Sequence, residues 1–234
     1  MIELYTKMLF IHVPGGSFQM GDTFGDGNDN EKPVHGVKLD SFYIGKYPVT
    51  QGQWKKVMNN NPSYFIKGDN YPVEKVSWND TQEFLKRLND MNKDTQYEFR
   101  LSTEAEWEYA ARSGGKKEKY AGGNNLDELA WYGKNSNGTT HPVGEKMPNG
   151  LGLFDMCGNV LEWCEDNYFD KAYIKHAKEN PVYLENNSGS RVLRGDAWGN
   201  NAMRCRAAYR SSCEPSRRNY LIGFRLVSSP RSVN

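Results

Sequence analysis

Helix start signals and the spacing of apolar side chains predict a first short helix near residue 50. Thr50 and Gln53 form a candidate capping box, in which each side chain would satisfy a free backbone N–H group. Trp54 and Val57 then give the segment an apolar face, and the Asn-rich stretch at 59–62, which ends in proline, stops it. We therefore expect a short helix here.

Two further helices follow the same logic. One begins near Asn79 or Asp80, and its apolar positions at helical spacing are Phe84, Leu85, Leu88 and Met91. The other opens with Thr103 and Glu106, and its apolar positions are Trp107, Ala110 and Ala111. We expect both helices to be amphipathic and to pack on the surface of the protein.

Strands are less sharply defined. The β-branched and aromatic content of residues 42–44, 191–194 and 224–227 predicts three short strands in a small sheet. Residues 116–149 and 168–190 instead have the composition of loops, with only local apolar anchors. These patterns favour an α+β protein that is rich in loops.

Charge and hydropathy narrow the function classes. The chain has 234 residues, with 30 Lys and Arg against 29 Asp and Glu, so its formal net charge is +1. Binding to nucleic acid through bulk positive charge is therefore disfavoured. The mean hydropathy is −0.82, and a bilayer-spanning helix needs about 20 consecutive apolar residues. We expect one domain over residues 1–234, no transmembrane segment, and a monomer.

Cysteine usage and the first ten residues bear on the compartment. The four cysteines, Cys157, Cys164, Cys205 and Cys213, are too few for a disulfide scaffold, and three pairings remain open if all are oxidised. Residues 1–10 lack the long apolar region and the small-residue cleavage site of a secretory signal. We expect a cytoplasmic protein, or a cell-surface protein if a leader has been removed.

Several phrases, in order along nearly the whole chain, resemble the formylglycine-generating-enzyme-type domain. They are VPGGSFQMG at 13–21, EKPVH at 31–35, PVTQGQW at 48–54, RLSTEAEWEYA at 100–110, GLFDM at 152–156, GNVLEW at 158–163 and GFR at 223–225. The resemblance implies a C-type-lectin-like α+β fold with short helices and small sheets. Fold alone does not give function.

The sequence departs from the cysteine pattern of the oxidases in this family. The oxidases that this domain resembles use two cysteines, five residues apart, after an Arg-Gly-Gly-Ser-aromatic motif, to bind copper and activate oxygen. Residues 194–206 contain only Cys205, and Cys213 lies eight residues further on. A two-thiolate copper site needs both sulfurs at one metal. We therefore expect no enzyme activity and no catalytic cofactor, with a formylglycine-generating or related oxidase as the alternative. The related iron oxygenases need a separate helical domain and a histidine cluster, and the four scattered histidines do not supply one.

The segment 191–227 resembles the variable region of ligand-binding proteins that are diversified by a retroelement. In such regions fixed residues alternate with residues that arise by mutation of adenines in adenine-rich codons, mostly those of Asn. Met203 and Glu214 cannot arise from an Asn codon in this way, so they come from a different codon or are fixed. The positions that fit the variable pattern, and that the resemblance assigns to ligand binding, are Asp196, Ala197, Gly199, Asn200, Asn201, Arg204, Tyr209, Ser211, Ser212, Cys213, Ser216, Arg217, Asn219, Tyr220 and Leu221.

This resemblance implies a ligand-binding protein with a hypervariable C-terminal surface, and we expect the unknown ligand to be a protein or a large surface. Tyr209, Tyr220 and Arg217 are the expected energetic anchors, because aromatic and Arg side chains dominate binding hot spots. The alternative is a binding relative without a retroelement. The test positions for one exposed patch are Gly199, Asn200, Tyr209, Ser212, Arg217, Asn219 and Tyr220. The positions expected to be buried are Trp198, Cys205, Arg206 and Phe224.

The turn at 155–162 resembles the calcium-binding segment of the family. The resemblance gives the side chains of Asp155 and Glu162 and the backbone carbonyls of Gly158 and Val160 as ligands of one structural Ca²⁺, an ion that takes six to eight oxygens. The alternative is that Asp155 caps a turn and Glu162 pairs with an arginine.

Other residues receive structural roles. The framework arginines, Arg194, Arg206, Arg210, Arg218 and Arg225, are expected to brace the segment by forking onto carboxylates and carbonyls rather than to bind an anion. The six tryptophans are expected to fill the core, with a sugar-binding platform as the alternative. Cys157, Cys164 and Cys205 are expected to be buried thiols and Cys213 to be exposed. None of the four histidines is assigned to catalysis.

Overall fold

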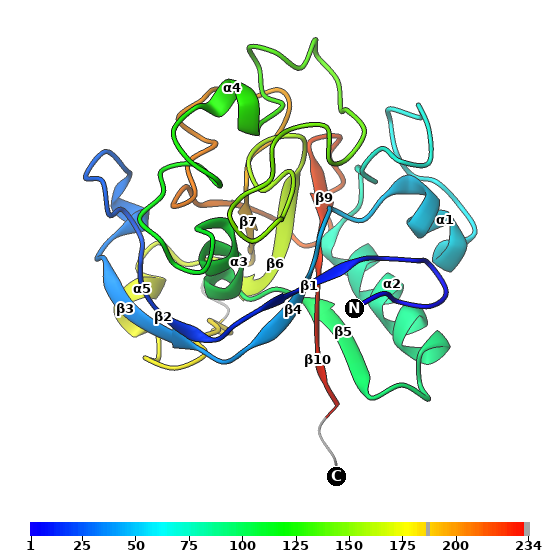
Figure 1. The fold of residues 1–234 in the computed structure, drawn as a ribbon, viewed down its shortest axis with the longest axis horizontal. Coiled ribbons are helices and arrows are strands. Elements are labelled where there is room, and N and C mark those ends of the chain that lie inside the picture. The colour runs from blue at the N-terminus through cyan, green and yellow to red at the C-terminus, as the bar shows by residue number, and fades with distance from the viewer. Residues whose placement is uncertain (186–187, 232–234) are drawn as a thin grey trace.

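The computed structural model describes residues 1–185 and 188–231. One four-stranded antiparallel sheet has the order β1 (Phe10–Val13), β4 (Phe42–Gly45), β10 (Leu226–Pro230) and β5 (Tyr97–Leu101). The first and last strands therefore both flank β4 (Figure 1).

A second four-stranded sheet carries most of the segment that resembles a variable region. Its order is β8 (Ser211–Cys213), β7 (Arg191–Arg194), β6 (Leu161–Asn167) and β9 (Ile222–Phe224). Only the β6–β9 pair is parallel. Residues 195–210 connect β7 to β8, and residues 214–221 connect β8 to β9.

A two-stranded hairpin and several short helical elements complete the fold. The hairpin pairs β2 (Gly16–Met20) with β3 (His35–Leu39), and the 3₁₀ helix η1 (Asp29–Glu31) lies between them in sequence. The short helices α4 (Leu126–Leu129) and α5 (Ala172–Lys175) interrupt the two stretches that were predicted to be loops.

The three predicted helices are confirmed, and each starts with a capping box. They are α1 (Gln51–Met58), α2 (Trp78–Met91) and α3 (Glu104–Ala111). Thr50 caps α1 and Thr103 caps α3, as the sequence predicts. The start of α2 was placed one or two residues late, because the box formed by Ser77 and Asp80 was not recognised.

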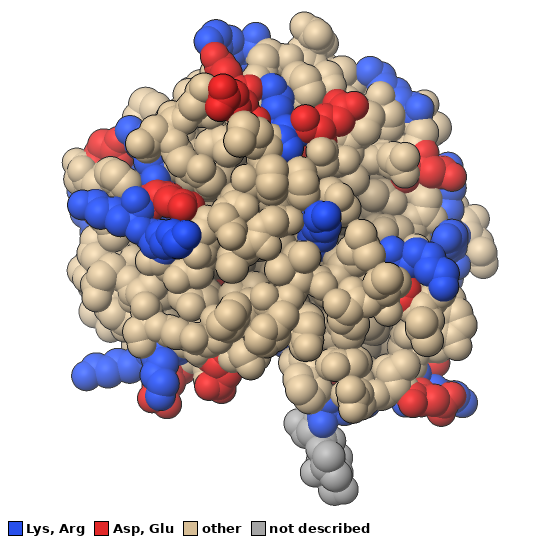
Figure 2. All heavy atoms as spheres, in the orientation of Figure 1, with Lys and Arg blue, Asp and Glu red and all other residues tan. Residues whose placement is uncertain are grey.

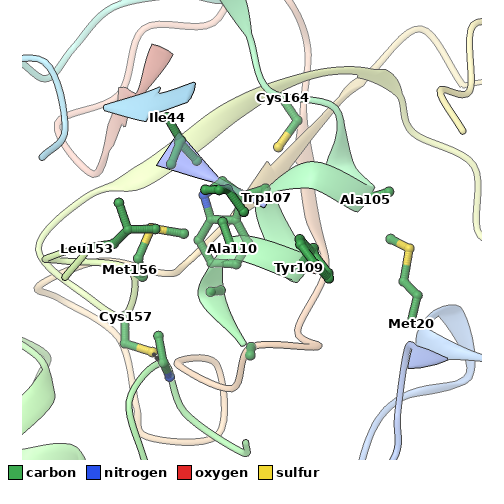
Figure 3. Close-up of a cluster of buried hydrophobic side chains, with 14 of the residues drawn as sticks. Met20, Ile44, Ala105, Trp107, Tyr109, Ala110, Leu153, Met156, Cys157 and Cys164 are labelled. Atoms are coloured by element: carbon green, nitrogen blue, oxygen red, sulfur yellow. Dashed lines mark hydrogen bonds between the residues drawn. The ribbon is translucent and has the colours of Figure 1, made fainter. Parts of the chain in front are cut away.

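The prediction that α3 is amphipathic and lies at the surface is wrong. All eight residues of α3 are buried, including Glu104, Glu106 and Glu108. Figure 3 shows Trp107 and Tyr109 of this helix among buried side chains, with Leu153, Met156 and Cys157 on one side and Met20 on the other. A helix with three buried glutamates is stable only where cations pair with them. Arg100 and Arg112, on either side of α3, pair with Glu106 and Glu108. The cations at Glu104, Arg194 and Arg210, come from a distant part of the chain.

The strand predictions are confirmed at 42–44 and 191–194, and corrected at 224–227. That stretch is divided between β9 and β10 at Arg225, whose guanidinium turns inward to Glu162. The remaining strands were not predicted. β6 has the sequence LEWCEDN, and its three acidic residues do not follow the pattern expected for a strand. Six of its seven residues are nevertheless buried, and Glu165 is half-buried.

Only three of the six tryptophans fill the core. Trp54, Trp107 and Trp163 are buried, whereas Trp78, Trp131 and Trp198 are partly exposed. The guanidinium of Arg191 covers Trp78, with its carbon 3.8 Å from the ring centroid. Trp131 stacks on His141 at 3.8 Å, with the Lys146 ammonium 4.0 Å from its ring. Cations therefore cover two of these rings.

The surface carries charges of both signs. On the face shown in Figure 2, basic and acidic side chains are interspersed around the periphery, and the centre is mostly uncharged. Within the described ranges, no helix combines the length and the apolar character needed to cross a membrane.

Candidate functional site

The variable-type positions lie on the two connections of the β8–β7–β6–β9 sheet and on β8 itself. Six of them have exposed side chains or backbone, namely Gly199, Asn201, Arg204, Ser216, Arg217 and Tyr220. Seven are half-buried, namely Asn200, Tyr209, Ser211, Ser212, Cys213, Asn219 and Leu221. We call these thirteen positions the exchangeable surface. Of the seven test positions that were predicted to be exposed, Gly199, Arg217 and Tyr220 are exposed. The other four are only half-buried, namely Asn200, Tyr209, Ser212 and Asn219.

Two positions assigned to ligand binding are not at the surface. Asp196 and Ala197 are buried, and this corrects the prediction that they belong to the ligand-binding set. Gly195 adopts φ +88°, and a Cβ atom there would lie 2.8 Å from Trp107, so the chain turns directly into the core after β7. The two residues that follow this turn are covered by the loop above them.

Two buried arginines hold the base of the exchangeable surface on α3. Arg210 donates from Nε and Nη2 to the two oxygens of Glu104, at 2.7 and 2.8 Å. Arg194 donates to Glu104 at 2.6 Å and to Glu108 at 2.8 Å. Burial alone would raise the pKa of Glu104, but the two guanidinium groups lower this pKa to about 2. The carboxylate therefore stays ionised inside the protein.

Two more framework arginines brace the segment in the same way. Arg206 forms a bidentate pair with the buried Glu31, at 2.6 and 2.7 Å. Arg225 donates to Glu162 at 2.8 to 3.1 Å and also donates to three backbone carbonyls. The bracing role predicted for the framework arginines is confirmed by these contacts, and Arg218 repeats the geometry on Asp80 at the surface.

An exposed aromatic patch borders the exchangeable surface. Trp198 and Tyr220 have ring centroids 5.8 Å apart, and each contacts a ring from the loop after α1: Trp198 meets Phe65 at 5.3 Å and Tyr220 meets Tyr64 at 5.9 Å. Tyr64 is 65% exposed, Ile66 68% and Tyr220 47%. We call these five residues the aromatic patch. Clustered exposed apolar rings mark binding surfaces in soluble proteins.

The burial of one residue of the aromatic patch was misjudged from the sequence, and three others were missed. Trp198 was expected to be largely buried and is partly exposed, because its indole packs on Phe65 and donates to the Tyr220 carbonyl at 3.3 Å instead of entering the core. The residues Tyr64, Phe65 and Ile66 were not considered at all. Three consecutive apolar residues in a loop, between Pro62 and Gly68, were the available signal.

A buried carboxyl group lies beneath this loop. Glu74 is fully buried, and its Oε1 accepts a hydrogen bond from the Phe65 backbone N–H at 2.8 Å. In the described part of the chain, its Oε2 has no hydrogen-bond partner. Burial raises the pKa of Glu74 to about 7, against the opposing hydrogen bonds from Phe65 and Tyr64. The loop is thus anchored on a group that changes charge near neutral pH.

The cysteines of the segment do not share a site. Cys205 is buried in the same apolar cluster as Cys157, whereas Cys213 packs at the edge of the other cluster. All four cysteines are free thiols. Burial raises the pKa of the Cys205 and Cys213 thiols above the ordinary range, and so does the neighbouring Asp196 for Cys205. Neither thiol is activated as a nucleophile or as a metal ligand. Cys213, expected to be exposed, is half-buried.

The proposed calcium ligands do not fit together as a cation site. Both oxygens of Glu162 already accept hydrogen bonds from the Arg225 guanidinium, and Oε2 also accepts from the Trp107 indole N–H at 2.7 Å. Asp155 accepts from the Gly144 N–H at 2.8 Å. A calcium ion at Glu162 would have to displace a buried guanidinium. The geometry matches the alternative, in which Asp155 holds a turn and Glu162 pairs with an arginine.

A group of two buried carboxylates and a half-buried histidine, all potential metal ligands, lies next to the arginine braces. Oxygen or nitrogen atoms of Glu104, Asp166 and His176 are all within 4.8 Å of one another. His176 Nδ1 also meets His35 Nε2 at 3.1 Å, so two histidines that share no spacing in the sequence are neighbours. Arg194 and Arg210 already pair with Glu104, so this cluster adjoins the contacts that support the segment.

Comparison with known proteins places these features in context. Residues 4–230 match the model of the sulfatase-modifying factor enzyme 1-like domain. The chain is 37% identical to the chaperone protein LppX of Paenibacillus barcinonensis, over 65% of this chain and 69% of that protein. It is 29% identical to the formylglycine-generating enzyme of Streptomyces coelicolor, over 93% of this chain and 88% of that enzyme. The structure of Treponema denticola variable protein 1 superposes with a TM-score of 0.84 and 30% sequence identity, over 94% of this chain and 95% of that protein.

Proposed function

The chain belongs to the family of sulfatase-modifying factor enzyme 1-like domains, and from this premise we propose that it is a binding protein rather than an oxidase. In this proposal the exchangeable surface and the aromatic patch together contact a protein or another large ligand. The match to a variable protein supports a binding-type member of the family. The hypervariable character of the surface is part of the proposal.

The proposal rests on the difference between buried framework residues and solvent-accessible residues within 191–227. Framework side chains such as Arg194, Arg210 and Arg206 are buried in charge-paired contacts with distant elements, whereas the exchangeable surface reaches solvent. Replacing a large buried side chain costs about 2–5 kcal/mol, but a change at an exposed position usually costs less than about 0.5 kcal/mol. Only positions of the second kind can be varied without loss of the fold.

The chemistry of the surface suits a large ligand. The exchangeable surface contains Tyr, Ser, Asn, Arg and Gly, which combine amphipathic contact area with adaptable hydrogen bonds. The aromatic patch adds a fixed contribution from Tyr64, Phe65 and Ile66 of the loop after α1, outside the segment. A ligand that spans both would bury aromatic anchors at its centre and meet variable polar side chains around them.

The absence of oxidase chemistry is a part of the same proposal. The position five residues before Cys205 is Asn200, whose side-chain amide donates to Asp196. We expect the purified chain, loaded with copper(I), to form no formylglycine in a sulfatase-motif peptide, as measured by mass spectrometry, with the Streptomyces coelicolor enzyme as the positive control. Clear turnover would contradict the binding-protein proposal.

Two matched libraries test the exchangeable surface. One randomises the six exposed positions Gly199, Asn201, Arg204, Ser216, Arg217 and Tyr220 on a display host. The control randomises six buried positions of the same segment, namely Cys205, Arg206, Ala207, Ala208, Ile222 and Phe224. Most clones of the first library should keep the display level and thermal stability of the parent, and most control clones should lose both. Equal losses in the two libraries would contradict the proposal.

Binding itself needs a separate measurement. Selection of the first library on a panel of purified proteins should enrich clones with new specificity, and Tyr64→Ser should weaken their binding, because the fixed part of the surface is shared by all clones. Retroelement diversification requires a reverse-transcriptase gene beside a near-copy of the segment encoding 191–227 that differs only at adenines. If the genome lacks both, the binding proposal stands without diversification.

A further inference from the structure

A groove of about 840 Å³ lies beside the β2–β3 hairpin, far in sequence from the exchangeable surface. Its lining shares no residue with the exchangeable surface or with the aromatic patch. Phe18 and Val37, which are directly opposite each other in the hairpin, lie at its floor with 5% and 1% of their surface exposed, and Val34, 39% exposed, adds an open apolar side chain. Its volume is in the range of small-molecule sites, roughly 300–1,000 Å³.

The turn after α3 forms one rim of the groove. Gly115 adopts φ +83°, and a Cβ atom there would lie 2.5 Å from the Cβ of Phe18, so only glycine allows the turn to lie directly on the hairpin. Lys116 and Lys117 follow this glycine at once, and both side chains are exposed. The close contact therefore fixes the backbone from which Lys116 and Lys117 project at the rim of the groove, and the Lys117 ammonium lies 5.3 Å from the centroid of the Phe24 ring.

The chain after α5 forms another part of the rim. The Lys38 N–H donates to the Lys178 carbonyl at 2.8 Å, and the Asn180 N–H donates to the Lys38 carbonyl at 2.9 Å. This short stretch lies alongside β3 and holds Lys178 and Glu179 at the groove. Backbone hydrogen bonds thus fix a third cation at the groove.

The charges around the groove are not balanced. Lys38 is paired with Glu179 at 3.0 Å, and the Arg112 guanidinium is occupied by Glu108, Thr23 and two backbone carbonyls. In the described part of the chain, Lys116, Lys117 and Lys178 form no ion pair, and the only other charged group that lines the groove is Asp22, which accepts three backbone N–H groups. The groove therefore has an excess of positive charge around its apolar floor.

We propose that this groove binds an anionic amphiphile, a small molecule with an apolar body and an acidic head group. The apolar body would contact Phe18, Val34 and Val37, and the carboxylate, sulfonate or phosphate group would lie among the three unpaired lysines. The combination is specific in its chemistry, because a neutral apolar molecule would leave the lysine charges uncompensated, and a small inorganic anion would leave the floor uncovered.

The experiment uses 1-anilinonaphthalene-8-sulfonate, an anionic aromatic probe that fluoresces when it leaves water, with the complete chain. We expect saturable binding, competition by dodecanoate, and at least tenfold weaker binding of the probe to the triple variant Lys116→Glu, Lys117→Glu, Lys178→Glu. The matched control replaces three exposed lysines elsewhere, Lys56→Glu, Lys86→Glu and Lys93→Glu, which makes the same change in net charge and should leave the affinity within twofold.

Two further arms keep the result interpretable. N-phenyl-1-naphthylamine, a neutral analogue, should bind at least tenfold more weakly than the anionic probe. Val34→Ser, which removes the exposed apolar side chain of the groove, should also reduce probe binding, whereas Tyr64→Ser in the aromatic patch should not. The proposal is overturned if the wild-type chain shows no saturable binding, if the two triple variants bind alike, or if only Tyr64→Ser removes binding. None of these results depends on the binding function proposed for the exchangeable surface.

Discussion

Arg210 and Arg218 make the same contact in two different regions of the molecule. Each forks onto a single carboxylate through Nε and Nη2, with distances of 2.6 to 2.8 Å. The pair of Arg210 with Glu104 is fully buried beneath the exchangeable surface, whereas 57% of the Arg218 side chain is exposed beside Asp80. The comparison shows that geometry alone does not tell which contacts hold the fold, because solvent decides how much each charge depends on its partner.

The largest expected effect comes from breaking the buried pair. Arg210→Ala leaves the Glu104 carboxylate inside the protein with only Arg194 as a cation, and we expect the free energy of unfolding to fall by about 3–5 kcal/mol. Arg218→Ala should cost no more than about 1 kcal/mol, because water replaces the lost partner. Urea denaturation of the two variants measures the difference. Similar losses in both would mean that burial does not distinguish the two regions.

The next effect concerns Glu74, the buried carboxyl group beneath the aromatic patch, whose pKa is raised more by burial than the nearby Lys75 lowers it. Because burial raises the pKa of Glu74 to about 7, above its value of 4.5 in an unfolded chain, the folded state binds the proton more tightly. Its contribution to stability is therefore complete below about pH 4.5 and is lost as the pH rises through 7. We expect Glu74→Gln to be more stable than the wild type by about 1–3 kcal/mol at pH 8 and nearly equal to it at pH 5.

Denaturation curves at several pH values test this sign. Glu104→Gln is the matched opposite, because the pKa of Glu104 is lowered to about 2, so its contribution to stability is present above about pH 4.5 and is lost as the pH falls toward 2. A stability of Glu74→Gln that follows the wild type at every pH would show that Glu74 does not titrate in this range.

A smaller effect is expected at the exchangeable surface. The combined variant Asn201→Ala, Arg204→Ala, Ser216→Ala, Arg217→Ala should unfold within about 1–2 kcal/mol of the wild type, since each exposed change costs less than about 0.5 kcal/mol. Thermal unfolding followed by circular dichroism is sufficient for the measurement. A loss as large as that of Arg210→Ala would remove the distinction between braced and exchangeable positions.

The smallest effect is expected from calcium. Because Arg225 already occupies Glu162, the melting temperature in millimolar calcium should agree with that in chelator to within about 2 °C, less than a change of 1 kcal/mol would produce in most domains of this size. A rise of several degrees with calcium that is abolished by Asp155→Asn would instead show that a cation binds at this turn.

Local signals in the sequence predicted local structure well. The capping boxes at Thr50 and Thr103 place two helix starts to the residue, since the partners are three positions apart. The resemblance to the family correctly gave the α+β fold, and it marked the arginines that brace the segment. It could not name their partners, because Glu31 lies 175 residues from Arg206 and Glu104 lies 106 residues from Arg210.

The errors have a common physical cause. Glu104 of α3 looked like a surface residue, because its pairing with the remote Arg194 and Arg210 is invisible in a local pattern. Trp198 looked like a core residue, because its packing on Phe65 depends on a loop more than 130 residues earlier. Asp196 and Ala197 fit the variable pattern in composition, yet the turn at Gly195 buries them. Burial in this protein is decided by contacts between distant segments.

The long separation between the braced partners has a consequence for folding and for engineering. The pairs of Arg194 with Glu104, Arg210 with Glu104 and Arg206 with Glu31 close loops of 90, 106 and 175 residues, and contacts of this kind form late because the closure entropy must be overcome first. A synthetic peptide of residues 191–227 would lack Glu31, Glu104 and Glu108, so it would remain unstructured. The exchangeable surface cannot be transplanted as a loop, and any graft of it onto another scaffold has to carry α3 and η1 with it.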